Sequence, residues 1–318
     1  EYSRRDDELS FSETWSFIKC GKCSSIFLHH RPDAASLPLA YSHYYTHASA
    51  SDEPSLVSEG ASLRNRMVQS YLAKRFGIRF PATSRLAALL IELILPVRML
   101  LDMYGRHVPR DMCSATTRLL DIGCGNGAYL LRAREMGITA MGCEPDIKAA
   151  EACRRQELDV IHGDAFDERL VPGSFDIITM HHVIEHVADP TALLSRAHSL
   201  LKPGGRLWLG LPNPQSLSLR LFGRSWKGFH PPFHLIIPTQ SVLQRWLLAS
   251  GFNSSKAVRR GMQSRGLWRM SETLFKREEG RNPKLSTPMR TLVDMAATLS
   301  PKYGEESVVV ATKAQDDV

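Results

Sequence analysis

The sequence predicts an α/β fold built on a doubly wound, mostly parallel sheet. Short apolar strands alternate with helical patterns from residue 117 to residue 213. Such alternation produces a parallel sheet with helices on both faces. The predicted strands lie near 118–122, 139–143, 158–162, 175–180 and 206–211, and the β-branched run 307–312 is expected to be the last strand of the sheet.

The rest of the chain divides by composition. Residues 1–60 are expected as an irregular N-terminal arm, and 61–116 as a helical extension. The α/β domain then occupies 117–318. Within it, the segment 214–238 is rich in proline and aromatic residues and is predicted to be a lid, whereas 261–303 is an insertion without a clean periodic pattern.

The most informative stretch is 118–130, which reads Arg-Leu-Leu-Asp-Ile-Gly-Cys-Gly-Asn-Gly-Ala-Tyr-Leu. Gly123, Gly125 and Gly127 let the backbone turn sharply and approach a ligand without Cβ clashes. A strand, a glycine turn and a helix N-terminus in this order form a nucleotide-sized site at the carboxyl end of a parallel strand.

Two ligands compete for this turn, and a turn without a ligand is the plain structural alternative. The spacing fits the dinucleotide fingerprint G-x-G-x-x-A. Asp121, however, lies two residues before the first glycine. A carboxylate repels a pyrophosphate and attracts a cation. S-adenosylmethionine (SAM) carries an ammonium and a sulfonium and no phosphate, so the acidic residue favours SAM.

The D-x-G-x-G-x-G turn resembles the first motif of the class I SAM-dependent methyltransferases. Three later segments, 139–146, 160–166 and 175–187, follow in the order of that family, and the helix-to-strand turn at 201–207 completes it. The resemblance implies a Rossmann-like, mostly parallel seven-stranded sheet with SAM as the cofactor.

The resemblance also implies which residues bind the cofactor. Glu144, about 20 positions after the glycines, is placed to accept hydrogen bonds from both ribose hydroxyls. Asp164 would face the adenine amino group, and Phe166 would cover the ring. The implied set is Asp121, Gly123, Cys124, Gly125, Asn126, Gly127, Glu144, Pro145, Asp164, Ala165, Phe166, Met180 and His181.

A narrower resemblance concerns the later part of the chain. The stretch 175–190 is similar to the H-V-x-E-H-V-x-D-P signature of a bacterial group related to the ubiquinone O-methyltransferases. Many members of that group act on sugars or secondary metabolites. The run 231–235 looks like the group's lid segment. Covering roughly 18–260 and a final strand near 306–313, the resemblance implies methyl transfer to a small-molecule or sugar acceptor, at oxygen.

Methyl transfer is an in-line displacement, so the enzyme mainly aligns the reacting atoms. An oxygen acceptor also benefits from a base, and histidine suits that task. His182 and His234 are the candidates for a base or an acceptor-positioning group, with His186 as a third. Glu185 and His186 are either a structural pair that fixes the loop or, as the related quinone enzymes imply, ligands of a divalent metal.

The pair Cys20 and Cys23 resembles the second half of a zinc-binding knuckle. Structural zinc normally takes four ligands, and the family's first pair would lie upstream of Glu1. Three histidines, His29, His30 and His43, could substitute, although their spacing does not require it. Bound zinc and a small buried thiol pair therefore stay open as alternatives.

Composition limits the function classes. The chain has 318 residues, 43% of them hydrophobic, and six cysteines, too few for a disulfide framework in a chain of this length. A reducing cytoplasm is therefore expected, and the polar, charged start shows no signal peptide. The sequence begins without methionine, so an upstream segment is an open question. Its net charge of +7 favours anionic partners mildly.

Nucleic acid and a membrane are two further partner classes. The basic residues of 256–290 suggest a solvated face, and the absence of a recognition helix or an aromatic RNA-stacking signature argues against nucleic acid. The apolar run 86–101 is interrupted by Glu92, Pro96 and Arg98, so it is too short to span a membrane. A packed helix is favoured there, with membrane-surface or oligomer contact as the alternative. The sequence does not indicate an oligomeric state.

Three other functions remain as alternatives to the methyltransferase. A catalytically silent SAM-fold binding or scaffold protein would bind SAM without turnover. A nicotinamide-dependent oxidoreductase would bind NAD instead. An RNA methyltransferase would bind nucleic acid with a steep salt dependence, although no Asn-Pro-Pro-Tyr-like motif for base methylation is present.

Overall fold

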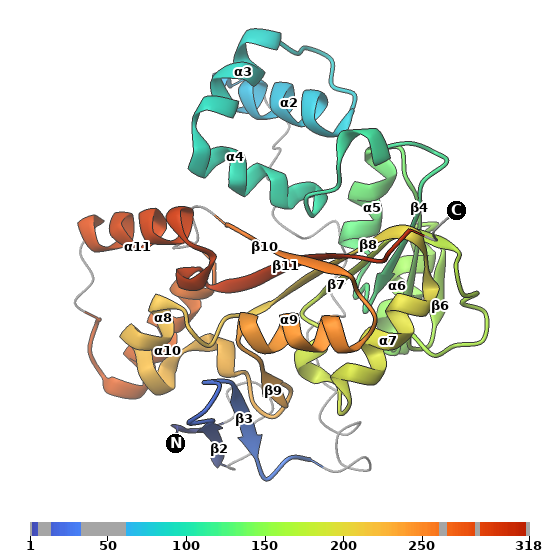
Figure 1. Cartoon of the computed structure of the whole chain (residues 1–318). Coiled ribbons are helices and arrows are strands. Elements are labelled where there is room, and N and C mark those ends of the chain that lie inside the picture. Colours follow the sequence, from blue (N-terminus) through green and yellow to red (C-terminus); the bar gives the residue numbers. More distant parts are fainter. Residues whose placement is uncertain (1, 6–13, 33–61, 261–265, 284–286, 316–318) are drawn as a thin grey trace. The chain divides into compact units, whose positions relative to one another are not determined.

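The computed structural model describes residues 2–5, 14–32, 62–260, 266–283 and 287–315 (Figure 1). The strands are β1 (Tyr2–Arg5), β2 (Thr14–Lys19), β3 (Ile26–His29), β4 (Arg118–Ile122), β5 (Thr139–Glu144), β6 (Val160–His162), β7 (Phe175–His181), β8 (Leu201–Pro212), β9 (Ile236–Ile237), β10 (Ser254–Val258) and β11 (Glu306–Thr312). The α-helices are α2 (Leu63–Phe76), α3 (Arg85–Leu93), α4 (Leu95–Asp102), α5 (Ala128–Glu135), α6 (Ile147–Arg155), α7 (Pro190–Leu200), α8 (Leu217–Phe222), α9 (Gln240–Ala249), α10 (Leu267–Glu279) and α11 (Thr287–Leu299).

The central sheet has seven strands in the order β10-β11-β8-β7-β4-β5-β6. Strand β4 pairs in parallel with β5 on one side and with β7 on the other, and β5 pairs in parallel with β6. Strand β11 runs against β8, because Lys313 N donates to the Gly205 oxygen and Asn213 N to the Glu305 oxygen. This arrangement confirms the predicted α/β fold with a Rossmann-like, mostly parallel sheet.

The direction of strand succession reverses at β4. Its last residue, Ile122, lies opposite Cys143 of β5 and opposite Met180 of β7. In open α/β sheets, ligands bind at the carboxyl ends of the strands where the succession reverses. The glycine turn that follows Ile122 is therefore at the position where such folds bind a ligand.

The chain divides into two units. Unit 1 comprises 1–44, 182–195 and 209–311, and unit 2 comprises 45–181, 196–208 and 312–318. Strand β8 contributes residues to both. The glycine turn belongs to unit 2, whereas three of the histidines singled out in the sequence, His182, His186 and His234, belong to unit 1.

In unit 2, the helical extension packs against side chains of β4 and β7. Helix α2 begins after Ser62, whose Oγ accepts a hydrogen bond from Asn65 N, and ends at Gly77 in the left-handed conformation. Its buried face carries Tyr71, Leu72 and Phe76, which join a core with residues of β4, β7, α5 and the segment after α4. This core connects the helices α2, α3 and α4 to β4, the strand that precedes the glycine turn.

In unit 1, a second sheet has the order β1-β2-β3-β9. The arm 1–60, expected to be irregular, thus supplies three strands. The predicted lid 214–238 contains α8 and β9. Most of its residues are buried, and several of them join a core with β2, β3 and α10. The insertion 261–303 contains α10 and α11. Whether 214–238 also covers an acceptor stays a prediction.

Candidate cofactor site and histidine cluster

The glycine turn has the conformation that its sequence requires. Gly123, Gly125 and Gly127 have φ values of +67°, +55° and +84°. A Cβ on Gly127 would lie 2.5 Å from Leu158 Cδ1 and 2.9 Å from Cys153 Sγ, so no side chain fits there. The positive φ values favour glycine at all three positions, and at Gly127 the lack of space requires it.

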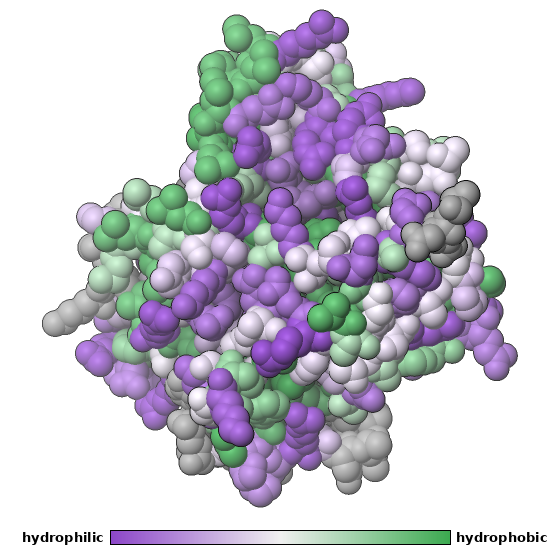
Figure 2. Space-filling view, in the orientation of Figure 1, coloured by the Kyte–Doolittle hydropathy of each residue, from purple (hydrophilic) through white to green (hydrophobic). Residues whose placement is uncertain are grey.

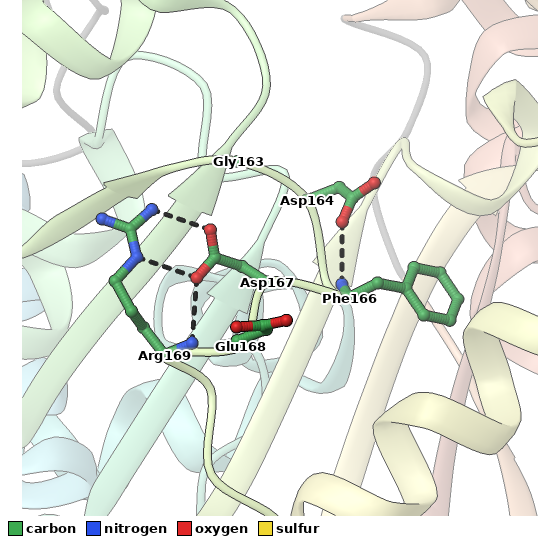
Figure 3. A pocket seen from close by; sticks show the side chains of 6 residues that line it. All are labelled: Gly163, Asp164, Phe166, Asp167, Glu168 and Arg169. Atoms are coloured by element: carbon green, nitrogen blue, oxygen red, sulfur yellow. Dashed lines mark hydrogen bonds and ion pairs between the residues drawn. The ribbon is translucent and has the colours of Figure 1, made fainter.

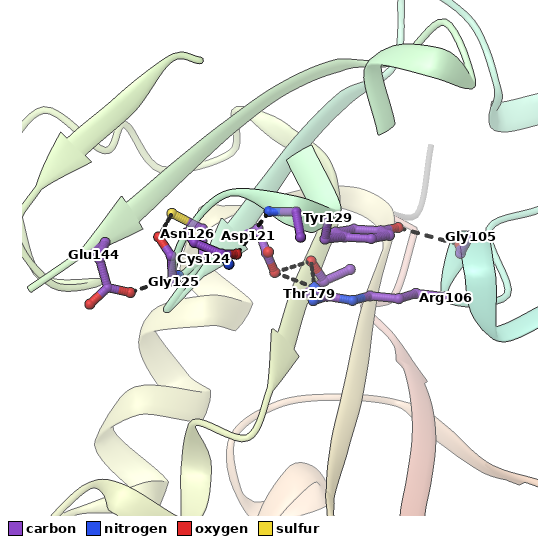
Figure 4. A network of polar contacts seen from close by, with 10 residues as sticks. Gly105, Arg106, Asp121, Cys124, Gly125, Asn126, Tyr129, Glu144 and Thr179 are labelled. Atoms are coloured by element: carbon purple, nitrogen blue, oxygen red, sulfur yellow. Dashed lines mark hydrogen bonds and ion pairs between the residues drawn. The ribbon is translucent and has the colours of Figure 1, made fainter. Parts of the chain in front are cut away.

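Strand β5 holds the turn through two sets of hydrogen bonds. The carbonyl of Cys143 accepts from the nitrogens of Gly123 and Cys124, at 2.9 and 3.2 Å. The buried Glu144 carboxylate accepts from Gly125 N through Oε2 at 2.8 Å and from Asp146 N through Oε1 at 2.9 Å. Figure 4 shows Glu144 directed at the turn. Each oxygen keeps a second lone pair, which a ribose hydroxyl could use.

The second acid of the site, Asp121, has a cationic partner within unit 2. Arg106 forms an ion pair with Asp121 Oδ1, and Thr179 Oγ1 donates to the same oxygen at 2.6 Å (Figure 4). The Arg106 guanidinium also lies 3.7 Å above the centre of the Tyr129 ring. Burial raises the pKa of Asp121, and the charge of Arg106 and the Thr179 hydrogen bond oppose that shift.

This ion pair changes the interpretation of Asp121. The sequence suggested that a cationic cofactor balances its charge, but Arg106 already does so. The other oxygen, Oδ2, is buried and has no hydrogen-bond partner among the residues that the structure describes. Buried acceptors are nearly always satisfied, so Oδ2 fits a hydrogen-bond donor of a bound ligand. An ammonium or a hydroxyl meets this requirement, and a pyrophosphate does not.

The loop after β6 carries the residues expected near adenine. Asp164 Oδ1 accepts from Phe166 N at 2.8 Å, and the Phe166 ring is half exposed. A shallow concavity here is lined by Gly163, Asp164, Phe166, Asp167, Glu168 and Arg169. Figure 3 shows the Phe166 ring pointing away from the ion pair of Asp167 and Arg169.

All thirteen residues of the predicted cofactor set lie in unit 2, at or just after the carboxyl ends of β4, β5, β6 and β7. Met180 is buried at the end of β7, and the ring of the next residue, His181, lies 5.6 Å from that of Trp208. The structure thus brings the set together at one edge of the sheet. Its contact with a cofactor stays a prediction.

Unit 1 contains the cluster of His182, Glu185, His186, His234 and Glu306, called here the histidine cluster. His182 lies between two carboxylates: Nδ1 is 2.9 Å from Glu185 Oε1, and Nε2 is 3.0 Å from Glu306 Oε1. Carboxylate oxygens accept hydrogen bonds, so each ring nitrogen of His182 faces an acceptor. Both nitrogens are therefore engaged in holding the two carboxylates.

His234 is in the opposite situation. Its Nδ1 lies 2.8 Å from the carbonyl oxygen of Gly228, which can only accept, so Nδ1 carries the hydrogen and Nε2 the lone pair. Burial, assisted by the nearby His186 and His230, lowers the pKa of His234 well below its ordinary value. The Nε2 atom is 3.8 Å from Glu185 Oε1. His234 is thus a neutral imidazole with an available lone pair.

The other members complete the electrostatics of the cluster. Desolvation lowers the pKa of His186 to about 4. Burial raises the pKa of Glu185, but the hydrogen bond and the charge of His182 outweigh it, and the net shift is downward. Glu185 Oε2 is buried without a hydrogen-bond partner in the part of the chain that the structure describes. A carboxylate therefore lies beside two neutral imidazoles.

This arrangement has two chemical uses. The lone pair of His234 can accept a proton, as the sequence suggested. The ligand atoms of Glu185, His186 and His234 also lie within 4.8 Å of one another, a spacing at which the three could hold a divalent cation. His182, in contrast, is suited to orienting Glu185 rather than to accepting a proton.

The zinc expectation at Cys20 and Cys23 has no support in the structure. Both thiols are free and lie near the turn between β2 and β3. Of the residues described, no third cysteine, histidine, aspartate or glutamate joins them at metal-ligand spacing. His43, one of the suggested substitutes, lies outside the described residues.

Sequence reasoning missed Arg106 and Glu306. Arg106 lies between helical segments, in no motif, and it reaches Asp121 only through the packing of unit 2. Glu306 is the first residue of β11, one position before the run 307–312 predicted as the last strand, and it meets His182 across 124 positions of sequence. The only available signal was their charge beside otherwise apolar segments, which does not specify a partner.

Comparisons with known proteins agree with this geometry. A model of the methyltransferase domain family matches residues 75–256, more than half of the chain. A protein of Xanthomonas euvesicatoria named ubiquinone biosynthesis O-methyltransferase is 33% identical over 175 residues, covering 49% of this chain and 71% of that protein. A protein of the same name from Azotobacter vinelandii is 30% identical over 152 residues, covering 43% of this chain and 65% of that protein.

Among solved structures, a SAM-dependent methyltransferase of Thermotoga maritima, named as a possible histamine N-methyltransferase, aligns with a TM-score of 0.46. It is 20% identical and covers 70% of this chain and 91% of that one. The family match and the relatives decide the assignment. The chain belongs to the methyltransferase domain family and is a class I SAM-dependent methyltransferase.

Proposed function

We propose that this methyltransferase transfers the methyl group of SAM to a hydroxyl oxygen of a small-molecule acceptor. The observation that supports this best is the turn of Gly123, Gly125 and Gly127, which the buried Glu144 holds through Gly125 N and the buried Asp121 precedes. An unpartnered carboxylate oxygen at this turn suits the ammonium of SAM and would repel a pyrophosphate.

The proposal assigns roles to the residues of unit 2. Glu144 would accept hydrogen bonds from the ribose hydroxyls while it fixes the turn through Gly125 N. Asp121 Oδ2 would accept a hydrogen bond from the ammonium group of SAM, and Phe166 would stack on the adenine ring of SAM. When bound, SAM supplies a methyl group on a sulfonium, which is already activated for transfer.

The proposal assigns proton transfer to the histidine cluster of unit 1. His234 Nε2 would take the proton of the acceptor hydroxyl, because its lone pair is fixed by the bond from Nδ1 to Gly228. Glu185 lies 3.8 Å from that nitrogen, and its negative charge would stabilise the imidazolium that forms. His182, whose Nδ1 lies 2.9 Å from the same Oε1 atom, would position Glu185.

The relatives, which are named O-methyltransferases of ubiquinone biosynthesis, support a small-molecule acceptor. A ring hydroxyl loses its proton more readily than an alcohol does, so a dihydroxybenzene is the first probe. A sugar hydroxyl is the second, because the bacterial group resembled by 175–190 includes sugar enzymes.

The test is the formation of S-adenosylhomocysteine from SAM by the full chain, with 3,4-dihydroxybenzoate in one series and a nucleoside-diphosphate hexose in the other. Acceptor-dependent product formation in either series supports the proposal and distinguishes the two acceptor classes. SAM binding without turnover in both would favour a silent binding protein. Failure to bind SAM would refute the proposal.

A further inference from the structure

Helix α3 exposes an apolar stripe. Leu86, Leu89, Leu90 and Leu93 are all exposed, and Leu93 reaches 81%. Their spacing of i, i+3, i+4 and i+7 places them along one side of the helix. Figure 2 shows hydrophobic residues gathered over the region of α3 and α4.

The stripe is not the face by which α3 packs. Ala88 and Ile91, which point the other way around the helix, are buried against the rest of unit 2. The helix is thus apolar on both sides, and the outer side remains available. The next residue, Ile94, extends the stripe and is also exposed. Contiguous exposed apolar patches of this kind mark interaction surfaces.

The surroundings of the stripe are strongly basic. Residues 62–112, which contain α2, α3 and α4, hold nine lysines or arginines and three acidic residues. Their net charge of +6 accounts for nearly all of the +7 of the chain. Arg85 begins α3 and Arg79 lies in the preceding loop, and both are exposed. The acidic residue of α3, Glu92, is neutralised by Lys74 at 2.7 Å.

We propose that α3 and its basic surroundings dock on the surface of an anionic phospholipid bilayer. Leucines would enter the boundary between headgroups and acyl chains, while Arg79 and Arg85 meet the lipid phosphates. None of the helices described is long and apolar enough to cross a bilayer, so the contact is interfacial. A second copy of the chain would bring the same positive charge against this face, which disfavours self-association.

The test uses co-sedimentation of the full chain with vesicles and needs no methyl acceptor, so its outcome is independent of the proposed function. The vesicles are pure phosphatidylcholine, or phosphatidylcholine with about one third phosphatidylglycerol. The first variant carries Leu89→Gln and Leu93→Gln. Its matched control carries Leu221→Gln and Leu248→Gln, which alter leucines of similar exposure on α8 and α9. A second pair of double variants tests the positive charge. One carries Arg79→Gln and Arg85→Gln, and its matched control carries Arg154→Gln and Arg155→Gln on α6.

We expect binding to the anionic vesicles that weakens as salt is raised. The leucine variant should bind at least about tenfold more weakly than the parent, because each leucine removed loses its burial in the apolar layer of the bilayer. The arginine variant should lose binding mainly to anionic vesicles, and both controls should bind as the parent does. Equal binding by the leucine variant and the parent overturns the proposal. So does a salt-resistant dimer that the leucine variant abolishes, which would assign the stripe to self-association.

Discussion

His234 donates its Nδ1 hydrogen to the carbonyl oxygen of Gly228 over 2.8 Å, and this bond leaves the Nε2 lone pair beside Glu185. His182, three residues before Glu185, has both nitrogens engaged with carboxylates. The two histidines that the sequence offered as equal candidates are thus distinguished by their hydrogen-bond partners. The carbonyl leaves one with a lone pair that could accept a proton, whereas two carboxylates hold both nitrogens of the other.

Replacement of His234 should therefore reduce turnover more than cofactor binding. We expect His234→Ala to lower kcat about 10²- to 10⁴-fold, the usual contribution of a positioned base. SAM affinity, measured by calorimetry, should stay within about twofold, since the residue belongs to unit 1 and the cofactor set to unit 2. His198→Ala, on α7, is the matched control and should leave both quantities unchanged.

Two outcomes would contradict the base assignment. One is an unchanged kcat in His234→Ala. The other is a turnover that EDTA abolishes and that Mg²⁺ or Zn²⁺ restores, because that result would assign Glu185, His186 and His234 to a cation.

Glu144 should be the residue whose loss weakens SAM binding most clearly. Glu144→Ala removes the acceptor for Gly125 N and Asp146 N and, on our proposal, for the ribose. We expect a loss of roughly 1–3 kcal/mol in the binding free energy, the usual effect of unpairing charge-assisted hydrogen bonds. Glu151→Ala, an exposed acid on α6, is the control. Unchanged SAM affinity in Glu144→Ala would refute the ribose assignment.

The ion pair of Arg106 and Asp121 makes a prediction about stability. Arg106→Met leaves a buried carboxylate uncompensated, so the free energy of unfolding should fall by about 3–5 kcal/mol. The double variant Arg106→Met with Asp121→Asn should recover much of that loss, because the buried charge is then gone. Urea unfolding of the four proteins gives the coupling energy. A double variant as unstable as the sum of the singles would show that the two residues do not interact.

Glu305 makes the prediction about pH. Burial raises its pKa to about 7, and the hydrogen bond from Ser218 at 2.6 Å opposes that shift. Between about pH 4.5 and pH 7 the folded protein therefore holds more protons at this site than the unfolded chain. Its contribution to the free energy of unfolding falls as the pH rises through that window.

The size of this effect is on the order of 3 kcal/mol, at about 1.4 kcal/mol for each unit of pKa. Glu305→Gln lacks the titration, so relative to the parent it should gain about that much stability between pH 4.5 and pH 8. Unfolding followed by tryptophan fluorescence at both pH values measures the gain, with Glu151→Gln as the control. The histidine titrations occur in both proteins and cancel. If the difference in the free energy of unfolding between Glu305→Gln and the parent does not change with pH, the raised pKa of the Glu305 carboxyl is wrong.

The sequence predicted the parts of the molecule that local patterns encode. Apolar runs matched β4, β7 and β11 closely, because a strand buried on both faces leaves a nearly continuous apolar signal. The glycine turn was also predictable, because its backbone conformation requires glycine and therefore leaves a local pattern in the sequence. At Gly127, a Cβ would collide with Leu158.

The rest depends on long-range pairing. Strand β3 has four residues and pairs with β9, which is more than 200 positions later, so neither carries a sufficient local signal. The different hydrogen bonding of His182 and His234 depends on Glu306, which lies far along the chain from His182, and on the Gly228 carbonyl. Arg106 likewise reaches Asp121 only in the folded unit. Residue types indicated which side chains could act as a base. Only the fold shows which of them keeps a lone pair.

The claim tested most directly is that the turn between β4 and α5 holds SAM rather than a dinucleotide. Calorimetric titration of the full chain with SAM and, separately, with NAD decides it. We predict one SAM bound per chain, affinity weakened in Glu144→Ala but not in Glu151→Ala, and no heat from NAD. Saturable NAD binding without SAM binding would contradict the account.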